Sequence, residues 1–344
     1  MKIKHITLGS IEDVNEQLFN IYNTGGQYIF RGEGSDAYTL LPSSLRPNNM
    51  VKIHNAIINE YKKEFTQVKS EFRLLQEFYV YAKNNGLDIP KYERFERSEN
   101  PLDNRFWWEE EIEDYTVPYE LESLIALAQH YGTYTRLLDF SKDVNVAIYF
   151  GIVGALERMK SLTPKQLYDI DGNFVVWVID RKKLYQLNQQ GFPIVIIENS
   201  YGSNENLKAQ SGVFLYHKSK FFSPALMARF TKKNSSFQAP LTDRTPFDQV
   251  FEQFDSNLTD VMVKYIIPYK LVHKIYSQQY KNGNLAAKFF PGYLGVTRQI
   301  EDNRLYNWTD YYMRTKLPEE SIFQKWTDNI SMEDVDAQYG NYAY

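Results

Sequence analysis

The stretch YIFRGEGSDAYTLLPSSLRP, residues 28–47, holds the pattern from which the rest of the chain can be interpreted. It opens with Tyr28, Ile29 and Phe30, an apolar run typical of a buried strand. Arg31 follows directly and precedes Gly32-Glu33-Gly34, which predicts a glycine-punctuated turn. A cation beside small residues at the end of a strand is suited to holding an anion. We therefore expect Arg31 to belong to an anion-binding site.

The composition limits the class of protein. Of the 344 residues, 43% are hydrophobic, which is ordinary for a globular protein, and the net charge of −4 gives no general attraction to nucleic acid. The absence of cysteine excludes disulfides, thiolate catalysis and cysteine metal sites, and it favours a reducing compartment such as the cytoplasm. The first 16 residues contain no uninterrupted apolar segment, and no apolar run approaches the roughly 18 residues of a membrane span. We expect neither a signal peptide nor a membrane partner.

Hydrophobic periodicity predicts an α+β fold, with a mixed or antiparallel β core and flanking helices. Ser10 is the expected N-cap of the first helix. Helices are predicted at residues 11–23, 52–84, 119–131 and 144–159. Strands are predicted at residues 28–30, 137–140, 174–180, 193–197, 212–216 and 261–268. We expect one domain over residues 1–300 with a helical insert at about 50–118, followed by a tail-like C-terminal extension over 301–344.

A second polar cluster lies at residues 129–141, QHYGTYTRLLDFS, between a helix end and a strand. Each residue also has a structural interpretation. His130 could act as a last-turn cation on the helix dipole, Arg136 and Asp139 could form an ion pair, and Ser141 could cap the next helix. The density of polar residues at one strand edge indicates instead that they face a cleft.

A third candidate segment, residues 204–214, places Glu205 and Gln210 before a strand that begins at Gly212. From residue 206 to 242 the chain has no acidic residue, and aromatic residues are interleaved with basic ones. Such a pattern suits single-stranded nucleic acid, through phosphate attraction and base stacking, or else a core face opposite solvated lysines. The candidate nucleic-acid contacts are Lys218, Lys220, Arg229 and Lys232.

Metal and common nucleotide motifs are missing from the sequence. The five histidines are scattered, so no metal site is expected. No P-loop, dinucleotide fingerprint or nucleophile elbow is present.

Several of these motifs together resemble the FRG domain family, which is named for the tripeptide found here at residues 30–32. The resemblance includes the following LPSSLRP, the segment from Gln129 to Phe150, the QSGVF at 210–214, and the later Ile267-Pro268 and Phe290-Pro291-Gly292. It spans roughly residues 25–300. The family label by itself implies no chemistry.

The order of motifs also resembles that of ADP-ribosyltransferases of the arginine–serine–glutamate kind. The resemblance implies a related fold, NAD as co-substrate, and Arg31, Ser141 and either Gln210 or Glu205 as the catalytic set. This chain departs from the pattern because it has no clean Glu-x-Glu motif. The residues implied to hold NAD are Gly32, His130, Tyr131, Arg136, Asp139 and Tyr149.

Three functions are therefore carried forward. The first is an NAD-dependent ADP-ribosyltransferase, a toxin-like effector of anti-phage defence that modifies RNA or protein. The second is a non-catalytic module that binds a nucleotide or nucleic acid. The third is a hydrolase of NAD or nucleic acid with Asp139 or Glu205 as general base. A toxin implies a neutralising partner, for which residues 109–114 and 339–344 are candidate contacts.

Overall fold

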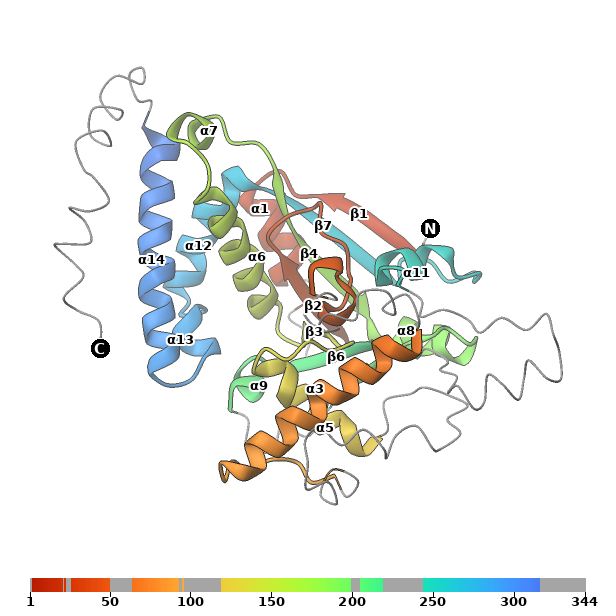
Figure 1. Cartoon of the computed structure of the whole chain (residues 1–344). Helices are drawn as coiled ribbons and strands as arrows, with labels where there is room; N and C mark the ends of the chain where they lie inside the picture. Colours follow the sequence, from red (N-terminus) through yellow and green to blue (C-terminus); the bar gives the residue numbers. More distant parts are fainter. Residues whose placement is uncertain are drawn as a thin grey trace.

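The computed structural model describes residues 2–20, 22, 26–49, 64–92, 95, 119–198, 205–218 and 244–315. These residues form a seven-stranded mixed sheet of order β1-β7-β4-β2-β3-β6-β5, in which β1 and β7 are parallel and all other neighbours antiparallel (Figure 1). The strands are β1 (Ile3–Thr7), β2 (Tyr28–Glu33), β3 (Leu138–Ser141), β4 (Asn173–Asp180), β5 (Ile194–Ile197), β6 (Gly212–His217) and β7 (Met262–Pro268). The predicted α+β class is confirmed.

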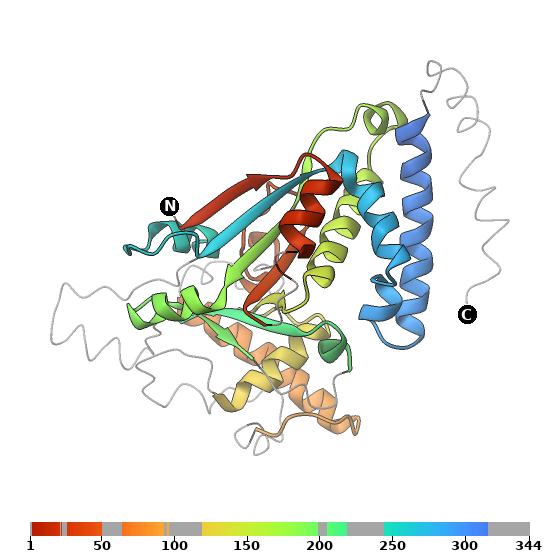
Figure 2. The same ribbon diagram turned by 180° about the vertical axis from the view of Figure 1, so that it is seen from behind.

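Helices cover both faces of the sheet (Figures 1 and 2). One face carries α1 (Ile11–Val14), which continues as the π-helix η1 (Asn15–Asn20), together with α6 (Val144–Met159), α7 (Pro164–Tyr168), η3 (Tyr269–Leu271), α12 (Val272–Lys281), α13 (Ala286–Phe289) and α14 (Tyr293–Arg314). The remaining elements are η2 (Ser43–Leu45), α3 (Glu64–Asn84), α5 (Tyr119–His130), α8 (Arg181–Gln189), α9 (Glu205–Ala209) and α11 (Phe247–Gln253). Ser10 caps α1 as predicted and forms a capping box with Asp13.

Alternation along the strands sends side chains into separate cores. Phe30 of β2 lies in the cluster built around α6 and α12, and the preceding Ile29 lies in the cluster covered by α8 and α11. On β6, Phe214 and Tyr216 pack against α3 and α5, whereas Val213 lies in the cluster covered by α8 and α11. The period of two therefore explains why both faces of the sheet are buried.

The sheet consists of two halves that meet at one residue pair. Phe30 pairs with Ser141, and this is the single register pair between β2 and β3 in the described chain. Beyond this pair, Arg31, Gly32 and Glu33 of β2 pair with β4 but not with β3 in the described chain. Leu138 and Asp139 of β3 likewise pair with β6 but not with β2. The strands β2 and β3 therefore diverge on one side of the Phe30–Ser141 pair, and Figures 1 and 2 show β6 running at an angle to β7 and β4.

The expected turn at residues 32–34 is wrong, because β2 continues to Glu33. The two glycines instead allow β2 to lie directly on α6. A Cβ on Gly32 would lie 1.7 Å from the carbonyl oxygen of Ala147, and one on Gly34 would lie 2.3 Å from the carbonyl carbon of Gly154. Side chains at these positions would push strand and helix apart, so the glycines serve backbone packing.

The expected tail after residue 300 is wrong for residues 301–314, which belong to α14. Asp302, Thr309 and Tyr312 of this helix are buried. Asp302 accepts a hydrogen bond of 2.7 Å from the Tyr149 hydroxyl, which links α14 to α6. Residues 316–344 lie outside the described chain.

The other predicted elements are confirmed within a residue or two, with two exceptions. The first helix, predicted at 11–23, ends at residue 20 in the described chain and is a π-helix over its second part. The long helix begins at residue 64 in the described chain, and residues 51–63 lie outside it. Ser141 does not cap α6, because Asp143 does so through a hydrogen bond from Asn145 N. None of the described helices is both long and apolar enough to cross a membrane.

Candidate functional site

The divergence of β2 and β3 leaves a cleft of about 570 Å³, within the usual range of small-molecule and cofactor sites. Its walls are β2, β3, the start of β6 and one face of α6. Among its lining residues are six that the sequence predicts as site residues: Arg31, Gly32, His130, Asp139, Ser141 and Gln210. The structure thus gathers residues from positions 31 to 210 of the chain in one place.

Arg31 is held on one wall of the cleft by groups from both halves of the sheet. Its Nε donates to Glu33 Oε1 at 2.7 Å, and its Nη1 donates to the backbone oxygen of Asp139 at 2.7 Å. The Asp139 carboxylate lies 4.0 Å from Nη1. In the described part of the chain no acceptor is recorded for Nη2. A fixed guanidinium with an N–H edge available is arranged to receive a phosphate or carboxylate.

His130 and Asp139 lie near each other in the cleft lining. His130 ends α5, and partial burial lowers its pKa, an effect that the nearby Asp139 carboxylate opposes. The Asp139 side chain is 61% exposed, so its carboxylate is open to a ligand. The last-turn position of His130 does fit a helix-dipole role, but at neutral pH the lowered pKa favours the uncharged imidazole.

Ser141 and Gln210 link the elements that form the cleft. The buried Ser141 hydroxyl donates to the backbone oxygen of Gln210 at 2.6 Å and accepts from Asp143 N at 2.9 Å. The Gln210 side chain donates through Nε2 to the backbone oxygen of Phe289 in α13. The Ser141 hydroxyl therefore fixes the relation of β3, the start of β6 and α6.

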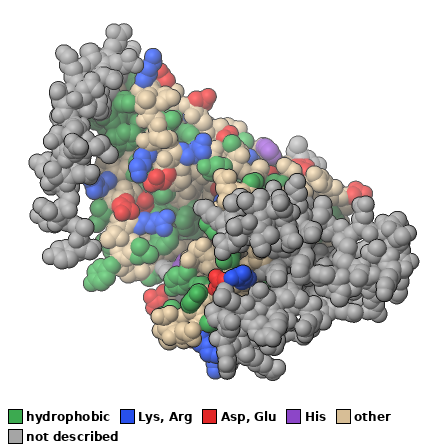
Figure 3. Space-filling view, in the orientation of Figure 1, with side chains coloured by type: hydrophobic (Ala, Val, Ile, Leu, Met, Phe, Trp, Pro, Cys, Tyr) green, Lys and Arg blue, Asp and Glu red, His purple; other side chains and the backbone are tan. Residues whose placement is uncertain are grey.

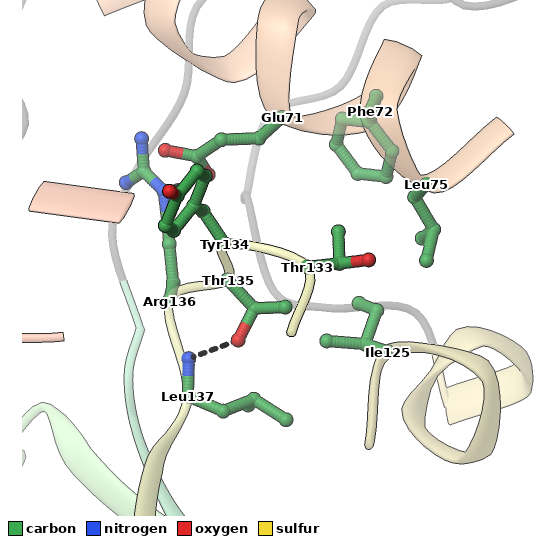
Figure 4. Close-up of a pocket in the computed structure, with 9 residues that line it drawn as sticks. All are labelled: Glu71, Phe72, Leu75, Ile125, Thr133, Tyr134, Thr135, Arg136 and Leu137. Atoms are coloured by element: carbon green, nitrogen blue, oxygen red, sulfur yellow. Dashed lines mark hydrogen bonds and ion pairs between the residues drawn. The ribbon is translucent and has the colours of Figure 1, made fainter. Parts of the chain in front are cut away.

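Arg136 does not line the cleft and does not pair with Asp139. It is 6% exposed, and its Nε donates to Glu71 Oε2 at 2.6 Å. Figure 4 shows the two side chains approaching each other beside Tyr134, at a small pocket of about 30 Å³ with room for little more than water. The location of Arg136 outside the cleft lining does not support its implied role in holding a cofactor, and its ion pair with Glu71 joins α3 to the segment that precedes β3.

Tyr149, which the resemblance also implies as an NAD contact, does not line the cleft. It is buried against α13 and α14 with its hydroxyl on Asp302, and burial raises its pKa well above the ordinary value. Phe150, the next residue, lines the cleft. Tyr131 is 67% exposed and Glu205 is exposed at the start of α9, and neither lines the cleft. The catalytic position expected of Glu205 is therefore not supported by its location.

The basic stretch is described only in part. Phe214 and Tyr216 are buried core residues, so for these two aromatics the core interpretation is correct. Lys218 is exposed at the end of β6, away from the cleft lining. The candidate contacts Lys220, Arg229 and Lys232, and the segment 109–114, lie outside the described residues. On the described surface in Figure 3, acidic and basic side chains lie interspersed.

Four ionisable residues of the cleft lining were not predicted as site residues from the sequence: Glu33, Tyr38, Glu157 and Arg158. Arg158 Nη1 donates to the Tyr38 hydroxyl at 2.9 Å, and its guanidinium lies 5.4 Å from the centre of the Tyr38 ring. On α6 the lining positions 146, 147, 150, 154, 157 and 158 follow helical spacing. The helical spacing of these positions is visible in the sequence, but the sequence does not show which face of the helix lines the cleft.

Comparison with known proteins identifies part of the chain. A family model described as the FRG domain matches residues 26–159, which include β2, α3, α5, β3 and α6. The chain therefore carries an FRG domain, and its cleft is formed largely by that domain. The resembling segments after residue 159 lie outside the match. No curated protein and no solved structure matched the chain in the other two comparisons. Among the described residues, no three His, Asp or Glu side chains gather as a metal site.

Proposed function

We propose that the cleft binds NAD and that the protein is an ADP-ribosyltransferase acting on RNA or, next in preference, on a protein. The observation that carries the proposal is the placement of Arg31, Ser141 and Gln210 on or beside the adjacent strands β2, β3 and β6, around one cleft. In this proposal the protein is a toxin-like effector of anti-phage defence, acts in the cytoplasm and has a neutralising partner.

The residues of the cleft fit a dinucleotide. Arg31 offers Nη2 to the diphosphate, while Glu33 and the Asp139 carbonyl keep its plane fixed. Gly32 and Gly34 place the backbone of β2 on α6 and leave no side chain of their own in the cleft. The volume of about 570 Å³ is of the size that cofactor sites usually have.

The reaction divides between the two walls of the cleft. The bond from ribose C1′ to the nicotinamide nitrogen breaks, and its electron pair leaves with neutral nicotinamide. The Asp139 carboxylate, open on the β3 wall, stabilises the positive charge that develops at C1′. A hydroxyl or amine of the acceptor forms the new bond to C1′ and gives its proton to the neutral imidazole of His130. In this scheme Asp139 and His130 take the catalytic position first expected of Gln210 or Glu205.

A second candidate, hydrolysis of NAD, is favoured by the exposure of Asp139. Its carboxylate is 61% exposed, so water can reach the same position as an acceptor. Hydrolysis would yield free ADP-ribose by the same bond cleavage, with water as the nucleophile. A module that only binds a nucleotide would leave NAD intact.

The proposal is tested with NAD labelled in its adenylate part, incubated with the full chain and cell lysate. We expect label in material that ribonuclease releases. Label that protease releases supports the protein-directed form, and free ADP-ribose without transfer supports the hydrolase. The Arg31→Ala variant should show label transfer reduced by about a hundred-fold or more. Arg73→Ala, at an exposed arginine on α3, serves as the matched control. Intact NAD under all conditions would overturn both enzymatic readings and leave the binding module.

A further inference from the structure

The cleft has a second end, away from the groups assigned to the reaction. Gly32 of β2 lies on Ala147 and Gly34 lies on Gly154, so the two elements run together along the cleft. Arg158 stands one turn beyond Gly154 and about 16 Å along the helix from Ala147. Tyr38, Glu157 and Arg158 mark this end in the lining of the cleft.

Tyr38 is held in place by a loop that is anchored to the sheet. The Asp36 amide donates to the backbone oxygen of Asn173 at 3.0 Å, and Asn173 Nδ2 donates to the Asp36 carboxylate at 2.9 Å. Lys264 Nζ donates to the Asp36 carbonyl at 2.8 Å. The loop is therefore fixed at β4 and β7, and the position of Tyr38 is set before a ligand arrives.

The Tyr38 side chain is 45% exposed, and Arg158 contacts both its hydroxyl and one ring face. A guanidinium that holds a phenol ring in this way orients the ring at a cleft wall. An oriented, exposed aromatic ring is a stacking platform for a nucleobase, since every base has a π-face.

We propose that Tyr38 and Arg158 form the subsite for the adenosine half of the ligand, an inference that rests on the proposed function. The polarity follows from the chemistry of the two ends. The ionisable groups assigned to the reaction, Asp139 and His130, lie on the β3 side and require the nicotinamide ribose there. With the diphosphate on Arg31, the adenosine half extends along α6 toward Tyr38.

The experiment measures the binding of each half of NAD by titration calorimetry, with AMP and nicotinamide mononucleotide as separate probes. Tyr38→Ala removes the ring, Tyr38→Phe keeps the ring without the hydroxyl, and Tyr185→Ala removes an exposed tyrosine of α8 as the control. We expect Tyr38→Ala to weaken AMP binding about ten-fold or more, as loss of a stacking platform does. Tyr38→Phe and Tyr185→Ala should retain AMP binding within about two-fold. Nicotinamide mononucleotide should bind equally to all four proteins.

Each other result is decisive. Equal AMP affinity in the native chain and Tyr38→Ala overturns the subsite, and a loss confined to nicotinamide mononucleotide overturns its polarity. Transfer of label from NAD with Tyr38-independent AMP binding means that the subsite fails while the proposed function stands. Tyr38-dependent AMP binding with no NAD turnover means the reverse. Absence of binding of AMP and NAD to the native chain overturns both.

Discussion

Gly32 lies directly against the backbone of Ala147: a Cβ at position 32 would come within 1.7 Å of the Ala147 carbonyl oxygen and 2.6 Å of the Gly151 nitrogen. Both obstacles belong to the backbone of α6, so a rotamer change cannot relieve the contact. The third residue of the FRG tripeptide is therefore a packing residue, and it sets the distance between the Arg31-bearing strand and the helix that forms the opposite wall.

Gly32→Ala is expected to lower the free energy of unfolding by about 3 kcal/mol or more, because β2 and α6 must separate to admit the methyl group. Urea denaturation followed by circular dichroism measures the change. Gly9→Ala is the matched control, since a Cβ there meets its nearest atom at 3.9 Å. Equal stability of both variants would contradict the backbone contact.

The fold was predictable where the pattern is local, and much of the site was predictable because its polar residues are dense. The strands around Phe174, Val213 and Ile267 follow from apolar runs between turn residues. Residues 301–314 looked like a tail because the buried side of α14 carries Asp302 and Thr309, whose partners come from other helices. Polar residues satisfied by tertiary contacts leave no apolar stripe to detect.

The sequence pointed to Tyr149, whereas Phe150 lines the cleft, and this difference also has a physical reason. Adjacent residues of a helix point about 100° apart, so a motif that includes both does not say which one faces the cleft. Arg136 shows the same limit, because its partner Glu71 lies 65 residues away on α3. A sequence can indicate that an arginine is special without indicating which carboxylate it meets.

Arg31→Ala is expected to reduce label transfer from NAD by about a hundred-fold or more, as loss of a preorganised charge in an active site does. Arg31→Lys should remain strongly impaired, because an ammonium cannot contact Glu33 and a phosphate through one rigid plane. Single-turnover kinetics and thermal melting check the rate and the fold. Full activity in a folded Arg31→Ala protein would exclude the proposed mechanism.

Arg136→Leu is expected to destabilise the protein by about 3–5 kcal/mol, because it leaves the Glu71 carboxylate buried without the cation at 2.6 Å. The double variant Glu71→Leu with Arg136→Leu should be more stable than Arg136→Leu alone. Denaturant titration of the native chain, the two single variants and the double variant completes the double-mutant cycle. A stable Arg136→Leu protein that no longer binds NAD would instead restore the ligand-binding role for Arg136.

Stability is expected to fall on acidification because of His273. Burial lowers its pKa to about 4, with Asp310 opposing and Arg314 reinforcing the shift, and its Nε2 lies 2.9 Å from Thr309 Oγ1. Between the ordinary pKa of about 6.5 and the folded value, the unfolded chain takes up a proton that the folded chain refuses. This residue should therefore cost about 3 kcal/mol of stability as the pH falls through that window, with no effect above it.

The check is the free energy of unfolding of the native chain and of His273→Gln from pH 4 to pH 8. The native chain should lose stability more steeply below about pH 6.5, and the two curves should run parallel above it. Parallel curves over the whole range would mean that His273 has the same pKa in the folded and the unfolded chain.

The single register pair between Phe30 and Ser141 has a consequence for how such a site diversifies. In the proposed function, the half of the sheet with Arg31 binds the anion, and the half with Asp139 and Gln210 faces the reacting end. Because a single register pair joins β2 and β3 in the described chain, we expect substitutions and insertions on β6 and β5 to change the acceptor without disturbing the β2–α6 contact. If the proposed function holds, we expect ligand binding to stay the same among related chains while the target varies.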